Sequence, residues 1–160
     1  MAPVALRHRW AVDLIAPKPG ERLLEIGCGH GLATGLALAA GAKLVAVDRS
    51  AKMVAACRKR NGSAEHLTVV EGVFETLSLG RFDAVFVVNV DFVRHPDLGW
   101  AKALAAATKP GGRAVLLLEA PVLRTADRFA LAVAASLTGV GFEVDTLLGD
   151  EMVAVRGVRR

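Results

Sequence analysis

The sequence has few of the residues that covalent, metal-based or membrane-embedded folds require. Only two of its 160 residues are cysteines, Cys28 and Cys57, so neither a disulfide framework nor a four-cysteine zinc site is possible. A charged residue interrupts every apolar run before it reaches the roughly 18 residues needed to cross a bilayer. The N-terminus lacks the basic-then-apolar layout of a secretory signal. We therefore expect a reduced, cytoplasmic protein.

Aromatic residues are also scarce, at 5% with no tyrosine, which argues against a surface that binds nucleic acid by base stacking. The charge is nearly balanced, and its net value of +4 permits an anionic partner without requiring one. Hydrophobic residues, by contrast, make up 53% of the chain. This length and composition predict a single domain over residues 1–160, with residues 1–20 as a short N-terminal helix and lid segment.

Apolar, β-branched runs alternate with Ala- and Leu-rich stretches of helical spacing, a pattern typical of a parallel sheet covered by helices. Strands are expected at residues 22–27, 43–48, 66–71, 82–89, 113–119, 142–148 and 152–158. Helices are expected at residues 4–15, 30–40, 50–60, 96–108 and 125–137. The last two strands have no helix between them, which predicts a hairpin and one antiparallel strand. The fold class is therefore α/β, a three-layer sandwich around a mostly parallel, seven-stranded sheet.

Three glycines lie at the end of the first expected strand and the start of the helix that follows it, in the run Gly27-Cys28-Gly29-His30-Gly31. Glycine lets the backbone turn sharply and approach a ligand closely, because it has no Cβ atom. The ligand would lie beyond the carboxyl ends of the strands, where α/β sheets bind cofactors. Asp48 ends the second expected strand, where its carboxylate can accept hydrogen bonds from both hydroxyls of a ribose. Together these residues predict a cofactor with an unphosphorylated ribose.

Two classes of cofactor satisfy these features, a dinucleotide and S-adenosylmethionine. The dinucleotide motif is G-x-G-x-x-G, but here the third glycine comes one position early and Leu32 occupies its place. Glu25 precedes the first glycine by two residues and puts a negative group near the loop, which suits a cation better than a pyrophosphate. S-adenosylmethionine carries a sulfonium and an ammonium group. These residues favour S-adenosylmethionine, and an NAD-binding oxidoreductase module is the alternative.

Four motifs occur in order along the chain: Glu25-Ile26-Gly27-Cys28-Gly29-His30-Gly31, Val47-Asp48-Arg49-Ser50, Phe82-Asp83-Ala84-Val85-Phe86 and Lys109-Pro110-Gly111-Gly112-Arg113. In order and spacing they resemble the class I S-adenosylmethionine-dependent methyltransferases, over essentially the whole chain. The resemblance implies a Rossmann-like fold that includes the final hairpin, and methyl transfer as the activity. It also implies a set of cofactor-binding residues: Glu25, Gly27, Cys28, Gly29, Asp48, Arg49, Met53, Gly72, Val73 and Asn89.

One departure from the family concerns adenine. Val73 stands where the family often has an acid that bonds the adenine amino group. Adenine recognition is then expected to depend on backbone groups and on packing by Val73 or Phe74.

The family's methyl acceptor faces the segment after the fourth expected strand, here residues 88–96. Asp91 and His95 are the titratable groups in it best placed to take a proton from an oxygen or nitrogen acceptor, so they are our candidate catalytic residues. His8 is expected to be structural or exposed, and Trp10 either a lid or a contact with the core. No residue is assigned to a metal.

A small molecule is the acceptor that we favour, because the sequence has neither a nucleic-acid-binding module nor a strong basic stripe. An RNA or protein methyltransferase is one alternative, and a non-catalytic scaffold that keeps the fold is another. No insertion forms a substrate cap. The acceptor pocket is therefore expected to be shallow, open to a large substrate, or completed by a homodimer or a partner subunit.

Overall fold

The computed structural model describes residues 5–91, 99–120 and 123–160. The strands are β1 (Arg22–Ile26), β2 (Lys43–Asp48), β3 (Leu67–Glu71), β4 (Phe82–Val88), β5 (Thr108–Glu119), β6 (Phe142–Gly149) and β7 (Met152–Arg159). The helices are α1 (Leu6–Ile15), α2 (Leu32–Ala39), α3 (Ala51–Asn61), α4 (Gly99–Ala107), α5 (Leu123–Gly139) and the short 3-10 helix η1 (Phe74–Thr76). In this described part of the chain, no helix has both the length and the apolar composition to cross a membrane.

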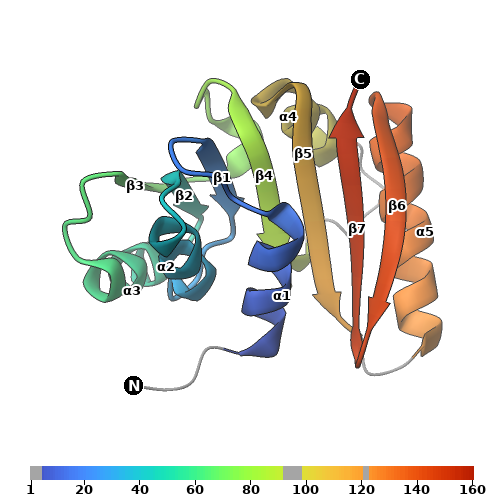
Figure 1. Cartoon of the computed structure of the whole chain (residues 1–160), viewed down its shortest axis with the longest axis horizontal. Coiled ribbons are helices and arrows are strands. Elements are labelled where there is room, and N and C mark those ends of the chain that lie inside the picture. Colours follow the sequence, from blue (N-terminus) through green and yellow to red (C-terminus); the bar gives the residue numbers. More distant parts are fainter. Residues whose placement is uncertain (1–4, 92–98, 121–122) are drawn as a thin grey trace.

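A single sheet with the strand order β3-β2-β1-β4-β5-β7-β6 forms the centre of the molecule (Figure 1). The pairs from β3 to β5 are parallel, and β7 runs antiparallel to both β5 and β6. The predicted α/β class, the mostly parallel seven-stranded sheet and the C-terminal hairpin are confirmed. The order reverses between β1 and β4, and the crevice at such a switch point is where open α/β sheets bind ligands.

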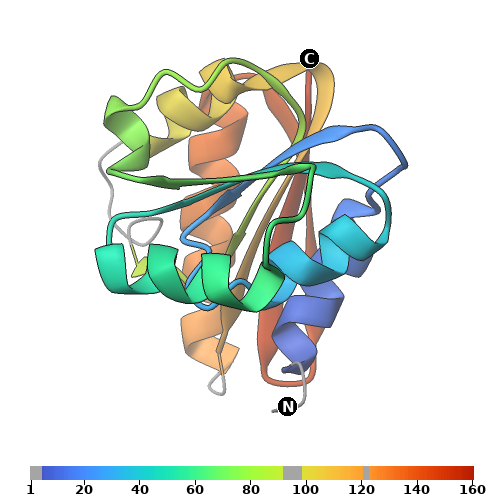
Figure 2. The same cartoon turned by 90° about the vertical axis from the view of Figure 1, so that its left-hand side faces the viewer.

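Helices cover both faces of the sheet (Figure 2). Alternate residues of a strand point to opposite faces, and β4 is apolar on both. Val85 and Val87 pack in the core that contains α4 and α5, whereas Ala84 and Phe86 pack in the core that contains α1 and α2. This two-sided burial confirms the three-layer sandwich and makes β4 a rigid support for the segment that follows it.

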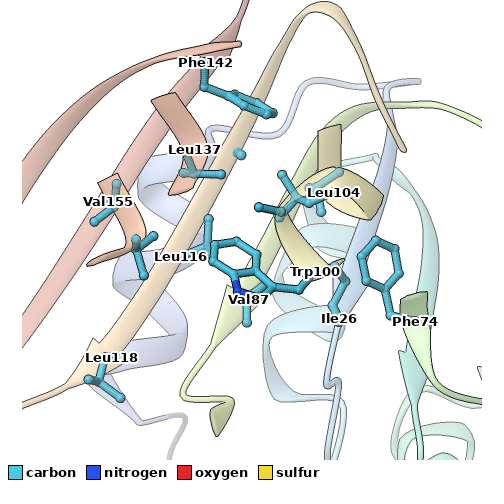
Figure 3. Close-up of a cluster of buried hydrophobic side chains, with 14 of the residues drawn as sticks. Ile26, Phe74, Val87, Trp100, Leu104, Leu116, Leu118, Leu137, Phe142 and Val155 are labelled. Carbon is cyan, nitrogen blue, oxygen red and sulfur yellow. The ribbon is translucent and has the colours of Figure 1, made fainter. Parts of the chain in front are cut away.

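The larger core lies between the sheet and the pair α4 and α5 (Figure 3). Trp100 and Leu104 of α4 pack there with Val87 and Leu116 of the sheet. The buried residues of α5 recur at helical spacing and form one apolar stripe: Ala126, Phe129, Ala130, Val133 and Leu137. This packing fixes the carboxyl ends of β4 and β5 relative to each other.

The helix after the glycine loop begins later than expected. Our prediction started it at residue 30, but α2 begins at Leu32. Gly31 is its N-cap and takes a left-handed backbone conformation, with φ of 74°. The extra two residues stay in the loop, which lengthens it at the edge where ligands bind.

The start of β5 also differs from the prediction. We expected a separate turn over residues 109–112, but these residues lie within the strand. Its pairing with β4 shifts between Phe82–Thr108 and Ala84–Arg113, so the intervening residues form a bulge. The expected start of the next-to-last predicted helix at residue 96 lies outside the described residues, and α4 is described from Gly99.

Candidate functional site

A cavity of about 760 Å³ opens beyond the carboxyl ends of β1, β2 and β4. Its volume lies within the range of about 300–1,000 Å³ typical of small-molecule sites. All the residues predicted at the cofactor line it: Glu25, Gly27, Cys28, Gly29, Asp48, Arg49, Met53, Gly72, Val73 and Asn89. Asp91 lines it as well, and His95 lies outside the described residues. The structure thus brings the predicted residues to one cavity, and their contact with a ligand stays a prediction.

The glycine loop borders the cavity with a backbone that other residues rarely adopt. Gly27 has φ of 75°, and a Cβ atom there would lie 2.4 Å from Cγ2 of Val90. Gly29 has φ of 51°, and a Cβ atom there would meet no atom within 4 Å. Position 27 therefore needs glycine to let the segment after β4 approach, whereas position 29 leaves open space for a ligand.

Asp48 joins the loop to the helix α3. Its Oδ2 accepts a hydrogen bond from the backbone N of Gly29 at 3.0 Å, and its Oδ1 accepts one from the backbone N of Ser50 at 2.9 Å. Ser50 in turn caps α3, with Oγ accepting from the backbone N of Met53 at 3.4 Å. Each carboxylate oxygen keeps a further lone pair, so Asp48 can hold the loop and accept from ligand hydroxyls together.

Glu25 is a buried carboxyl group at the cavity, with 2% of its surface exposed. Burial is the main cause that raises its pKa to about 8, and the nearby Cys57 and Asp48 add to the effect. Thr34 of α2 opposes the shift by donating a hydrogen bond from Oγ1 to Oε2 of Glu25, at 2.5 Å. Glu25 therefore carries a proton at neutral pH in this structure, and a cation in the cavity would favour the ionised form.

Two polar residues that were not predicted from the sequence form hydrogen bonds with Glu25 and with the glycine loop. Thr34 is fully buried beneath Glu25, and Asn61 ends α3. Nδ2 of Asn61 donates to the backbone O of Gly31 at 3.1 Å and to the backbone O of Cys57 at 3.0 Å. A threonine in an otherwise apolar helix is a weak signal in the sequence, and the role of Asn61 depends on contacts distant along the chain.

The Cys28 thiol is structural in this arrangement. Both cysteines are free and buried, Cys28 in the glycine loop and Cys57 on α3. The contact with the Cys57 thiol and burial both raise the pKa of Cys28, which keeps it a neutral thiol and a poor nucleophile. Among the described ranges, no group of three or more His, Cys, Asp or Glu side chains is placed to hold a metal ion.

The edge of the cavity near β3 combines apolar residues with the exposed side chain of Glu75. Val73 is 51% exposed at the cavity, whereas Phe74 is 6% exposed and packs in the core beside α4. Met53 of α3 is partly buried at the same cavity. Of the two residues expected to pack on an adenine, Val73 is therefore the more accessible.

The first turn of α1 also lines the cavity, through Arg7 and His8. We expected His8 to be structural or exposed, and the structure shows it half-buried at the cavity. Trp10 packs on the β6–β7 hairpin, where a Cβ atom on Gly149 would lie 3.2 Å from its ring. Trp10 is thus a contact with the core rather than a lid.

The model of a family described as methyltransferase domain matches residues 23–112. The chain belongs to this methyltransferase domain family. Ribosomal protein L11 methyltransferase of Burkholderia ambifaria is 35% identical over 114 residues, which are 71% of this chain and 36% of that protein. The enzyme of the same name from Burkholderia vietnamiensis is 34% identical over 114 residues, which again are 71% of this chain and 36% of that protein. The methyltransferase domain thus spans about a third of the length of these curated relatives.

Solved methyltransferases share the fold of the whole chain. A putative methyltransferase in complex with the Haloferax volcanii Trm112 methyltransferase activator has a TM-score of 0.82 at 14% identity, with 95% of this chain and 88% of that chain covered. The glycopeptide N-methyltransferase MtfA complexed with sinefungin has a TM-score of 0.79 at 19% identity, with coverages of 96% and 92%. A SAM dependent methyltransferase from Aquifex aeolicus has the same TM-score at 15% identity, with coverages of 96% and 89%.

These findings confirm the family that the four motifs predict, the class I S-adenosylmethionine-dependent methyltransferases, and with it the cofactor that defines the family. They also decide between the two cofactor classes left open by the glycine loop. The methyltransferase match includes that loop, Asp48 and the bulge at the start of β5.

Proposed function

We propose that this methyltransferase domain binds S-adenosylmethionine in the cavity beyond β1, β2 and β4 and transfers its methyl group to a small-molecule acceptor. One observation carries the proposal. A buried carboxyl group, a glycine loop and a half-buried aspartate border the same space. S-adenosylmethionine has a group that complements each of them: a positive charge for the carboxyl group, an amino-acid part for the glycine loop and ribose hydroxyls for the aspartate.

The lining suggests an orientation for the cofactor. Asp48 accepts from the ribose hydroxyls, and the backbone at Gly27 and Gly29 lies against the amino-acid part. Glu25 supplies negative charge to the positive end of the cofactor, and Cys28 fills the loop. Adenine lies against the remaining residues predicted at that end: Arg49, Met53, Gly72 and Val73.

Methyl transfer is a displacement at a carbon that the sulfonium already activates, so the protein chiefly aligns the reactants and excludes water. Asn89 turns the chain at the end of β4 with φ of 57°, and its backbone N donates to the backbone O of Leu117 at 2.7 Å. This turn brings Val90 and Asp91 to the cavity. Asp91 is one candidate to take a proton from the acceptor, and His95 remains the other.

A protein acceptor is the second candidate, because the curated relatives are named ribosomal protein L11 methyltransferases. The match covers 36% of the first of those proteins, so their name describes proteins much longer than the matched segment. The complex of the Haloferax volcanii activator with a methyltransferase supports a partner subunit, or a homodimer, that completes the acceptor site. We place the protein in the cytoplasm, where two free thiols stay reduced.

A screen with cofactor labelled in the methyl group tests the acceptor class. We expect label on at least one member of a panel of small phenols, amines and thiols, and none on purified ribosomal protein L11 or total RNA. Label on L11 or RNA alone would overturn the small-molecule proposal. Binding of S-adenosylhomocysteine without transfer to any acceptor would favour the scaffold alternative.

A further inference from the structure

Helix α1 contributes to the cavity from outside the segment that matches the methyltransferase family model. It packs across β4 and β5, as Figure 1 shows, while the matched segment begins at residue 23. Arg7 and His8 of its first turn line the same cavity as Asn89 and Asp91. Helix α1 therefore adds an arginine and a histidine to the wall of the cavity.

The position of this pair is fixed by packing and by one ion pair. Ala11 and Ile15 of α1 are fully buried in the core beneath β4 and β5. Arg7 Nη1 contacts Oε1 of Glu119, at the carboxyl end of β5, at 2.8 Å. The His8 ring thus has a defined place in the wall of the cavity that the segment after β4 also lines.

The environment of His8 keeps its imidazole neutral. Burial and then the charge of Arg7 lower its pKa below 6.5, while Glu119 of β5 and the backbone of Ala5 act in the opposite direction. Its Nδ1 is shielded from water and has no hydrogen-bond partner within the described residues, so proton exchange with the cavity must use Nε2. A neutral imidazole has a lone pair at neutral pH, so it can accept a proton from a group in the cavity.

We propose that His8 is a catalytic residue that takes the proton from the methyl acceptor. The inference rests on the proposed function. A lone pair of the acceptor's oxygen, nitrogen or sulfur forms the bond to the methyl carbon, and the C–S bond breaks with its electron pair going to sulfur. The proton on the acceptor atom passes to an imidazole nitrogen of His8. The imidazolium lies near the Glu119 carboxylate and then loses its proton to water. The acceptor class is therefore a protonated nucleophile, such as a phenol, an amine or a thiol.

The first test needs no acceptor. In protein labelled with ¹⁵N-histidine, the His8 imidazole should titrate below pH 6.5, and its signals should move when S-adenosylhomocysteine saturates the protein. His8 signals that saturating S-adenosylhomocysteine leaves unchanged would overturn the proposal, because the ring would then lie away from the reaction. A failure of S-adenosylhomocysteine to bind at all contradicts the proposed function instead, so the two failures are distinct.

The second test uses the phenol, amine or thiol that takes label in the screen. His8→Gln should lower kcat at pH 7 by about 10²–10⁴-fold while the affinity for S-adenosylhomocysteine stays within twofold. The wild-type kcat should fall as the pH drops through the lowered pKa of His8, and the variant should lack this fall. Arg9→Gln, at an exposed position on the same helix, is the matched control and should change neither quantity. A kcat for His8→Gln within threefold of wild type, or a large loss only in Asp91→Asn, would overturn the role of His8.

Discussion

Replacement of Asp48 by alanine is expected to weaken the binding of S-adenosylhomocysteine by about 10²–10⁴-fold. Two charge-assisted hydrogen bonds to the ribose hydroxyls would be lost, each contributing roughly 1.5–3 kcal/mol. The variant also loses the bonds from Asp48 to the backbone N of Gly29 and of Ser50, which hold the glycine loop against α3. Isothermal titration calorimetry of the two proteins measures the difference.

This loss of affinity must be distinguished from an indirect effect of destabilising the helix α3. Ser50→Ala removes the side-chain cap on the backbone N of Met53 and leaves the Asp48 carboxylate in place. The Ser50→Ala variant should have a lower Tm, since a cap contributes roughly 1 kcal/mol to stability. Its affinity for S-adenosylhomocysteine should stay within about threefold of the wild type. A folded Asp48→Ala variant with unchanged affinity would show that the ribose binds elsewhere.

The contribution of Glu25 to the stability of the ligand-free protein should fall as the pH rises from about 5 to about 7.5. The Glu25 side chain ionises near 4.5 in the unfolded chain, while burial raises its pKa to about 8 in the folded protein. Between these values the folded state holds one proton that the unfolded state has lost. Between these two pKa values, Glu25 should therefore decrease the free energy of unfolding by about 1.4 kcal/mol for each pH unit.

Urea denaturation at a series of pH values measures this dependence, with Glu25→Gln as the reference. Glutamine cannot ionise, so the variant should lack the Glu25 contribution and show a flatter profile. Saturating S-adenosylhomocysteine, which keeps the ammonium group of its amino-acid part, should reduce the slope of the wild type because a cation favours the carboxylate. Parallel pH profiles for the wild type and Glu25→Gln would contradict the raised pKa of Glu25.

The elements of this fold follow from local patterns in the sequence. The apolar run at residues 82–89 predicts a strand, and β4 covers all but the last residue of it and is buried on both faces. Glycines at 27 and 29 predict a sharply turning loop, and the structure has φ of 75° and 51° there. These features depend on residue type and on neighbours along the chain, so they can be predicted without contacts from distant segments.

The features that sequence reasoning missed depend on contacts between distant segments. His8 lies at the cavity only because α1 packs across β4 and β5, which no pattern within residues 5–15 specifies. Glu25 was identified by its place before the glycine loop, but its raised pKa depends on burial and on Thr34 from the next helix. The bulge at the start of β5 likewise depends on the register with β4.

The binding of S-adenosylhomocysteine, measured by calorimetry against NAD at the same protein concentration, tests the central claim most directly. The claim is that the cavity bordered by Glu25, the glycine loop and Asp48 accepts a cationic adenosine cofactor with a free ribose. We expect S-adenosylhomocysteine to bind at micromolar concentrations and saturating NAD to give no heat of binding. Binding of NAD together with no binding of S-adenosylhomocysteine would contradict the account.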